Sequence, residues 1–123
     1  MLKPKFKKFN WFIKIITFNW PLAITLSPFG IYVNQKYKTL KTVPESTKNH
    51  EKIHWKQQLE MLIIFFYIWY LVEWLINIVI VLIKNKPIKD AYYNISFERE
   101  AYGNENNFNY LENRKFYTWI KYI

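Results

Sequence analysis

Both histidines of the chain lie in one five-residue segment, His50-Glu51-Lys52-Ile53-His54, which has the pattern H-E-x-x-H. On a helix, residues four apart lie one above the other, so both imidazoles can reach the same zinc ion. Glu51, beside the first histidine, is then placed to activate a water molecule bound to that ion. Chance alone would produce this arrangement roughly once in a thousand such chains. The segment therefore predicts a hydrolytic zinc site, and the alternative is a solvated helix start without metal.

A third protein ligand must come from elsewhere, because two histidines and a water do not make a stable catalytic zinc site. The chain contains no Cys, which leaves carboxylates. Glu98 and Glu100 are the best candidates, and Ser96 before them can cap a helix whose first turn contains Glu98. The alternative is that both acids only complement the dipole of that helix.

Together the two segments resemble the gluzincin metallopeptidases, in which HExxH is followed on a later helix by a metal-binding Glu. In the membrane-embedded branch, which processes prenylated or misfolded membrane proteins, the second motif is E-x-x-x-D. Alignment of that motif implies that Glu98 is the third metal ligand and leaves Glu100 as the alternate ligand. Tyr102 stands where the family has an Asp that orients nearby ligands.

Most of residues 20–123 also resembles a group of small uncharacterised bacterial proteins with N-H-E-K-I-H-x-x-Q-Q and S/P-F-E-R-E-A-Y segments. The two resemblances imply a zinc-dependent peptidase. In it, His50, His54 and Glu98 hold the zinc ion, and Glu51 is the general base rather than a ligand.

Further side chains can assist such a site. Hydrolysis needs a hydrogen-bond donor for the developing oxyanion, and Tyr102 and Tyr93 are candidates among ten tyrosines. Gln57, Gln58 and Glu73 can support the ligands from outside. The alternative to a supporting role, for each of these three, is a side chain that is solvated or satisfied within the core.

Composition indicates one small domain in contact with lipid. The 123 residues are enough for a single core, and 21% of them are aromatic, which exceeds what a soluble core of this size needs. The net charge of +9 comes from lysine, whereas Arg occurs only at Arg99 and Arg114. Because arginine is the usual residue for reading bases and phosphates, we expect no nucleic-acid partner. The oligomeric state cannot be inferred from the sequence.

The first twenty residues are predicted to be a basic, aromatic leader ahead of a metallopeptidase-like domain at residues 21–123. They lack the sustained apolar stretch and small-residue cleavage site of a signal peptide. The leader is either a floppy extension or an interfacial anchor that combines lysines with Trp11, Phe12 and Trp20.

A short β-hairpin is predicted next, with strands at residues 24–26 and 31–33 around a turn at residues 27–30. Zincins use an edge strand beside the active-site helix to hold an extended peptide, so this hairpin either binds substrate or only packs. After it, Ser46 or Thr47 is predicted to cap the helix that carries the histidines and runs on through Glu60.

Residues 61–83 form an apolar segment in which only Glu73 and Asn77 are clearly polar, long enough to cross a bilayer. If residues 47–84 were one straight helix, Glu98 would lie roughly 35 Å from His54. We therefore predict a reversal or sharp bend near residues 64–67. It would return the chain along the first helix and place Lys84 near the first turn of the helix that carries the histidines.

The sequence thus predicts an α+β fold that is mainly α: a hairpin, a motif-bearing helix, an apolar helix, and a last helix from about Asp90 that is broken near Gly103 and reaches Tyr110. The expected function is a membrane-associated zinc metallopeptidase acting on a peptide or protein, suspected in a bacterial inner membrane. The alternatives are a small membrane protein without catalysis and a protein that binds zinc but is inactive.

Overall fold

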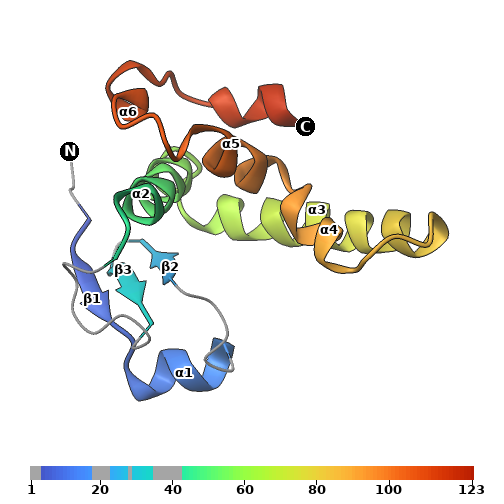
Figure 1. The fold of residues 1–123 in the computed structure, drawn as a ribbon, viewed down its shortest axis with the longest axis horizontal. Coiled ribbons are helices and arrows are strands. Elements are labelled where there is room, and N and C mark those ends of the chain that lie inside the picture. Colours follow the sequence, from blue (N-terminus) through green and yellow to red (C-terminus); the bar gives the residue numbers. More distant parts are fainter. Residues whose placement is uncertain (1–3, 18–22, 28, 35–42) are drawn as a thin grey trace.

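The computed structural model describes residues 4–17, 23–27, 29–34 and 43–123 (Figure 1). Within them the fold is α+β and mainly helical, as predicted, with a small three-stranded sheet beside several helices. Along the chain the elements are β1 (Phe6–Lys8), α1 (Trp11–Thr17), β2 (Ala23–Leu26), β3 (Gly30–Val33), α2 (Glu45–Glu60), α3 (Ile64–Ile83), α4 (Lys89–Tyr93), α5 (Ser96–Asn104), α6 (Tyr110–Asn113) and the 3-10 helix η2 (Thr118–Tyr122).

The predicted hairpin is confirmed. β2 and β3 pair antiparallel, with Ile24 opposite Tyr32, and β1 adds to the other side of β3 in parallel. Gly30 allows the chain at Lys5 to come close to β3, because a Cβ atom at position 30 would lie 2.7 Å from the backbone oxygen of Lys5. Glycine also tolerates the φ of +148° found at this position. The strand order β1-β3-β2 leaves β2 at the edge of the sheet, next to α2.

In the N-terminal segment, Phe9 just before α1 and Ile13 within it are buried, whereas Trp11 and Phe12 are exposed. The third aromatic residue of the predicted interfacial anchor, Trp20, lies outside the described residues.

The helix that carries the histidines begins earlier than predicted. α2 starts at Glu45 directly after Pro44, and no side chain caps it, so the prediction that Ser46 or Thr47 caps this helix is wrong. The fixed φ of proline suits a helix start, and the Glu45 carboxylate in the first turn complements the helix dipole. The end at Glu60 agrees with the prediction.

α2 ends in a Schellman motif built without glycine. The Ile63 amide donates to the Gln58 carbonyl over 2.7 Å, and the Leu62 amide donates to the Leu59 carbonyl over 3.3 Å. Leu62 and Ile63 have positive φ values of 54° and 65°, which are unfavourable for side chains of this kind. The bend therefore lies at residues 61–63, just before the predicted range of 64–67. Residues 61–63 include no glycine, proline or asparagine that would mark a bend in the sequence.

The predicted return of the apolar segment along α2 is wrong. α3 is one unbroken helix that projects from the molecule, and its end at Ile83 lies far from α2 (Figure 1). Residues after Lys84 come back along α3 instead. The Asn77 side chain donates to the Ala91 carbonyl over 3.1 Å, and the Ser96 amide donates to Glu73 over 3.0 Å. A straight apolar helix and a closed site are thus compatible, because the bend comes before the helix.

Aromatic rings join α3 to the C-terminal part. The ring centroids of Phe66 and Phe97 are 4.4 Å apart, and those of Phe97 and Trp119 are 4.7 Å apart. Where one broken helix was predicted from Asp90 to Tyr110, the structure has α4, α5 and α6. Ser96 is the first residue of α5 rather than its cap, because its hydroxyl and its amide both donate to Glu73.

Candidate metal centre

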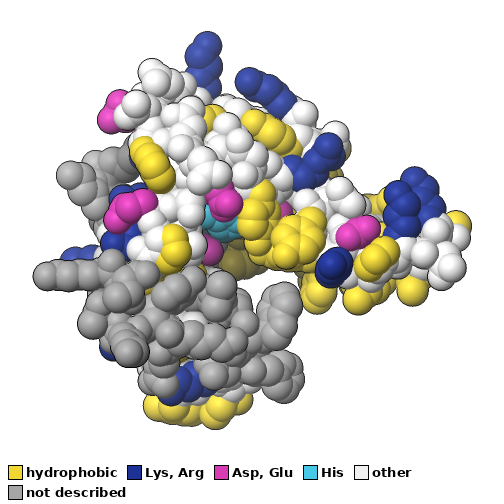
Figure 2. Space-filling view, in the orientation of Figure 1, with side chains coloured by type: hydrophobic (Ala, Val, Ile, Leu, Met, Phe, Trp, Pro, Cys, Tyr) yellow, Lys and Arg dark blue, Asp and Glu magenta, His cyan; other side chains and the backbone are white. Residues whose placement is uncertain are grey.

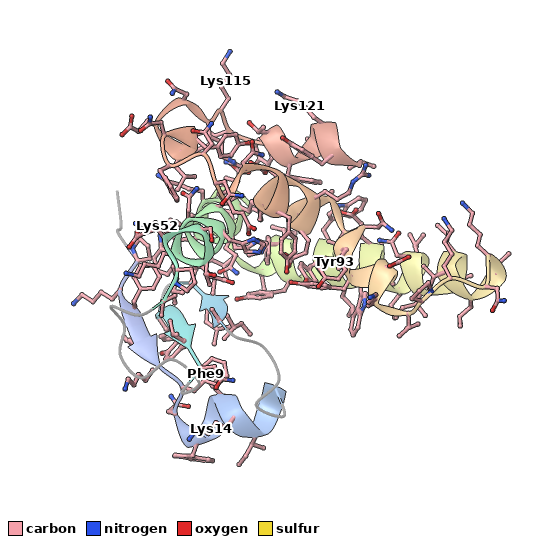
Figure 3. All side chains as sticks on the ribbon, in the orientation of Figure 1. Phe9, Lys14, Lys52, Tyr93, Lys115 and Lys121 are labelled. Atoms are coloured by element: carbon pink, nitrogen blue, oxygen red, sulfur yellow. The ribbon has the colours of Figure 1, made fainter. Side chains whose placement is uncertain are left out.

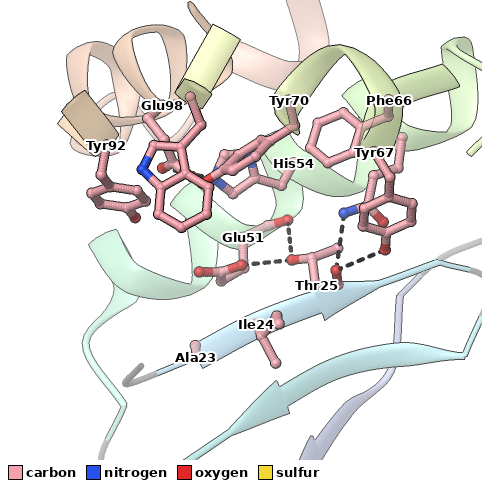
Figure 4. Close-up of a pocket in the computed structure, with 12 residues that line it drawn as sticks. Ala23, Ile24, Thr25, Glu51, His54, Phe66, Tyr67, Tyr70, Tyr92 and Glu98 are labelled. Carbon is pink, nitrogen blue, oxygen red and sulfur yellow. Dashed lines mark hydrogen bonds and ion pairs between the residues drawn. The ribbon is translucent and has the colours of Figure 1, made fainter. Parts of the chain in front are cut away.

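Three buried side chains converge on one point between α2 and α5. His50 and His54 are one turn apart on α2, and their Nε2 atoms are 3.1 Å from each other. Oε1 of Glu98, in the first turn of α5, lies 3.1 Å from Nε2 of His50 and 3.0 Å from Nε2 of His54. The structure therefore brings together the three residues named from the sequence as metal ligands, and Figure 4 shows two of them, His54 and Glu98.

The outer nitrogen of each imidazole has its own partner. Nδ1 of His50 lies 2.9 Å from Oε2 of Glu105, and Nδ1 of His54 lies 2.8 Å from Oε1 of Gln57. The amide nitrogen of Gln57 donates to the Phe97 carbonyl, so its oxygen is the atom that accepts from His54. Each imidazole, when neutral, therefore carries its proton on Nδ1, and its Nε2 lone pair faces Glu98.

This donor set fits a metal ion. Two Nε2 lone pairs and a carboxylate oxygen would repel one another at 3.1 Å without a proton or a metal ion between them. At about 2.0–2.1 Å from a tetrahedral zinc ion, such ligand atoms lie roughly 3.3 Å apart, close to the spacing found here. Metal-bound histidines usually donate their other N–H to a carboxylate or carbonyl, as His50 and His54 do.

The electrostatics of the cluster favour positive charge at the same point. Burial lowers the pKa of His54, but the charge of Glu98 and the hydrogen bond to it more than offset this and raise that pKa to about 9. Burial raises the pKa of Glu98, yet His54 and His50 hold it well below its usual range. A metal ion at this point would therefore compete with protons for these three side chains.

Glu51 lies beside the cluster in the wall of a cavity of about 320 Å³, which His54 and Glu98 also line (Figure 4). The Thr25 hydroxyl on β2 donates to Oε2 of Glu51 over 2.6 Å and holds this carboxylate in place. The other walls come from β2 and from aromatic side chains of α3 and α4. The general base named from the sequence therefore faces a space that can take water and a substrate.

Two side chains of α3 position Glu98. The Tyr70 hydroxyl donates to Oε2 of Glu98 over 2.8 Å, which leaves Oε1 for the histidines. Glu73, named above as a possible supporting residue, holds the first residue of α5. The sequence analysis missed Tyr70. The spacing of Tyr70, Glu73 and Asn77 could have identified it, because these three residues fall on one face of an otherwise apolar helix.

A further carboxylate contacts His50 at the end of α5. Glu105, which the sequence analysis did not name, lies two turns after Glu98 and accepts from His50. Its loop is tied to α2 because the Asn49 amide contacts the carbonyls of Glu105 and Asn107 at 2.9 and 3.1 Å. Tyr102 packs on His50 instead, with ring centroids 4.3 Å apart.

Among the tyrosines, Tyr92 lines the cavity and its hydroxyl lies 3.2 Å from that of Tyr102. Tyr93 packs against Tyr102 with centroids 5.3 Å apart and is half exposed (Figure 3). Tyr67 and Tyr70 of α3 complete the tyrosines in the cavity wall.

Glu100, the alternate ligand, points into a different cluster. Its carboxylate binds Arg114 at 3.1 Å and accepts from Tyr110 at 2.7 Å, and Arg114 also pairs with Glu60 at 2.8 Å. Burial raises the pKa of Glu100, but the hydrogen bonds from Arg114 and Gln57 lower it overall. This cluster ties the end of α2 and the middle of α5 to the C-terminal segment.

Gln58 holds the edge strand beside the cavity. Its amide nitrogen donates to the Thr25 carbonyl and its oxygen accepts from the Ser27 amide, both over 2.9 Å. Thr25 and Ser27 therefore turn their backbone groups away from β3, and strand alternation turns those of Ala23 the same way. The outer edge of β2 faces the site.

Comparisons with known proteins add no relative: no protein-family model, no curated protein and no solved structure matches this chain. α3, with 20 residues, is long and apolar enough to cross a membrane, and only 11% of its apolar window is buried within the protein.

Proposed function

We propose that the protein is a membrane-associated zinc peptidase, which hydrolyses a peptide bond in a peptide or protein. The observation that carries this proposal is the convergence of His50, His54 and Glu98 within 3.1 Å, next to Glu51 in the wall of a cavity. Two imidazoles and a carboxylate leave a fourth position open, as catalytic zinc sites require.

Each side chain has a part in this chemistry. If a zinc ion were bound, His50, His54 and Glu98 would hold it, and it would supply Lewis acidity for a water molecule and for a substrate carbonyl. Glu51 accepts the proton of the attacking water, and the hydrogen bond from Thr25 holds the Glu51 carboxylate in place for this role. Tyr92 would donate to the developing oxyanion; its place in the cavity wall and the contact of its hydroxyl with that of Tyr102 support this role.

The edge of β2 supports a peptide as the substrate. Gln58 already forms hydrogen bonds with the Thr25 carbonyl and the Ser27 amide, whereas Ala23 lies at the cavity wall with its backbone groups directed away from β3. An extended peptide that pairs with the strand there would place a backbone carbonyl beside Glu51 and the ligands.

The test compares wild type with Glu51→Gln, an amide that cannot accept the proton. Glu112→Gln, an exposed acid on α6, is the matched control. We expect wild type and control to contain one zinc per chain and to cleave quenched fluorescent peptides, while Glu51→Gln retains zinc and loses at least about 100-fold in rate. Zinc without turnover in the wild type would indicate an inactive binding protein, and a folded, metal-free wild type would indicate a membrane protein without catalysis.

A further inference from the structure

The polarity of α3 is inverted relative to a helix of a soluble domain. Its covered residues form one narrow stripe that includes Phe66, Tyr70, Glu73, Asn77 and Val81, and the polar ones bind α4 and α5. All fourteen exposed residues of α3 are apolar or aromatic. Polar groups that face the protein and apolar groups that face outward are the pattern of a helix in contact with lipid.

A perpendicular span does not fit the way the chain returns. α3 is about 30 Å long, which equals the hydrocarbon core of a bilayer. Ala91 pairs with α3 at Asn77, and Ser96 pairs with it at Glu73, so α4 and the start of α5 lie alongside the same helix. A span would place the exposed Lys89 of α4 at the level of the hydrocarbon, where a charged side chain is costly.

Charge complements the apolar surface at the end of this arm. Lys84, Lys86 and Lys89 are exposed around the turn between α3 and α4, and Figure 2 shows hydrophobic side chains along the projecting arm and basic ones gathered at its tip. The fourteen exposed residues of α3 include no charged one. Lysines beside an uncharged apolar face match the headgroups and acyl chains of an anionic membrane surface.

We infer that α3 lies flat in one leaflet of an anionic membrane. Its covered stripe, α4 and α5 face water, and its exposed residues enter the acyl chains. Lys84, Lys86 and Lys89 then sit at headgroup level. The protein is held on one side of the bilayer and does not cross it.

This placement bears on the substrate, a point that rests on the proposed peptidase function. Tyr67 and Trp74 belong both to the exposed set of α3 and to the wall of the cavity that contains Glu51. The cavity wall is therefore continuous with the lipid-facing surface. Peptide segments with apolar side chains at the membrane surface are the substrate class that this arrangement fits.

The first experiment measures flotation of the purified full chain with vesicles of phosphatidylcholine, with and without phosphatidylglycerol. We expect binding that the anionic lipid strengthens at least tenfold. Leu75→Glu combined with Leu82→Glu, opposite the covered stripe, should abolish it. Phe108→Glu, an equally exposed apolar side chain after α5, should not. Circular dichroism checks that each variant is folded.

Charge reversal has a control of equal net charge. Lys86→Glu with Lys89→Glu should remove the preference for anionic vesicles. Lys115→Glu with Lys121→Glu should leave it, because these two side chains project from the C-terminal segment, away from α3 (Figure 3). Equal loss in both pairs would contradict the placement and indicate a response to total charge only.

The second experiment separates a flat helix from a span. The chain has no Cys, so Glu45→Cys and Lys86→Cys each carry one thiol, at the start of α2 and at the tip of the arm. With protein added to sealed vesicles, a membrane-impermeant maleimide should label both thiols from outside. Labelling of Lys86→Cys only after the vesicles are opened would overturn the inference in favour of a span.

The remaining outcomes are also decisive. Absence of flotation together with a dimer in light scattering that Leu75→Glu dissociates would assign α3 to a second copy of the chain. Because Glu51→Gln should float like the wild type, loss of peptidase activity and loss of membrane binding are scored separately.

Discussion

Oε1 of Glu98 lies 3.0 Å from Nε2 of His54, although the two residues are 44 positions apart. The contact joins the middle of α2 to the first turn of α5. It exists because the bend at Leu62 and Ile63 separates α2 from α3, and because Glu73 of α3 accepts a hydrogen bond from the first residue of α5. The candidate metal centre therefore depends on the helix that carries the apolar surface.

The ligand set predicts that one zinc per chain copurifies and is lost in His50→Ala and His54→Ala. Each substitution removes one of three protein ligands. Elemental analysis of purified protein measures this, with Glu112→Ala as the control. Chelation should also lower the melting temperature of the wild type, since metal at 100 times its Kd adds about 2.7 kcal/mol of stability. Zinc retained in both histidine variants would contradict the assignment.

Glu105→Gln should weaken zinc binding about 10- to 100-fold without unfolding the protein. The carboxylate that accepts from Nδ1 of His50 orients the ring and makes it a stronger ligand. Competition with a chromogenic chelator measures the affinity, and Glu112→Gln again serves as the control. Equal affinity in the two variants would show that Glu105 is a bystander.

Tyr70→Phe should also weaken zinc binding, and should destabilise the protein by about 1–3 kcal/mol, because it leaves a buried oxygen of Glu98 without its donor. Tyr67→Phe is a close control on the same helix, since its hydroxyl makes only a 3.4 Å contact with the Thr25 carbonyl. Urea unfolding of both variants decides the point, and the expectation fails if they are equally stable.

Metal-free protein should be most stable between about pH 4.5 and 6.5. The pKa of His54 is raised to about 9, so its contribution is complete below 6.5 and is lost as the pH rises through 9. The pKa of Glu98 is lowered, so its contribution is present above 4.5 and is lost in acid. Melting temperatures of chelated protein across this range measure the effect.

His54→Gln is the control, and it should remove the decline of stability on the alkaline side. Zinc affinity should rise with pH over the interval in which metal-free stability falls, because the proton must leave before the metal binds. A flat profile in chelated wild type would mean that the ion pair between His54 and Glu98 is absent.

The bend after α2 predicts that Leu62→Gly stabilises the protein by about 1 kcal/mol. Leu62 is exposed and has a φ of 54°, so glycine removes strain at little cost in packing. Leu71→Gly in the interior of α3 should destabilise by about 1 kcal/mol. Denaturant midpoints measure both, and destabilisation of similar size in the two variants would contradict the strained bend.

The sequence by itself determined the local elements and the candidate ligands. The hairpin follows from β-branched residues around a proline and glycine turn, and the end of α3 follows from Asn85-Lys86-Pro87. The spacing of His50 and His54 places both on one helical face, and the Glu of the later segment could be named by its resemblance to a known motif. These signals act within a few residues, where neighbours in sequence are neighbours in space.

Only the tertiary structure decided how these parts meet. The bend at Leu62 and Ile63 uses residues that rarely take positive φ, so tertiary packing and not local preference must hold it there. Glu105 and Tyr70 support the ligands across distances of 55 and 28 residues, which no local pattern encodes. The outward-facing apolar surface of α3 also follows from the tertiary structure, in which the few polar residues of this helix bind α4 and α5. Packing, and not position in the chain, fixes the partner of a side chain.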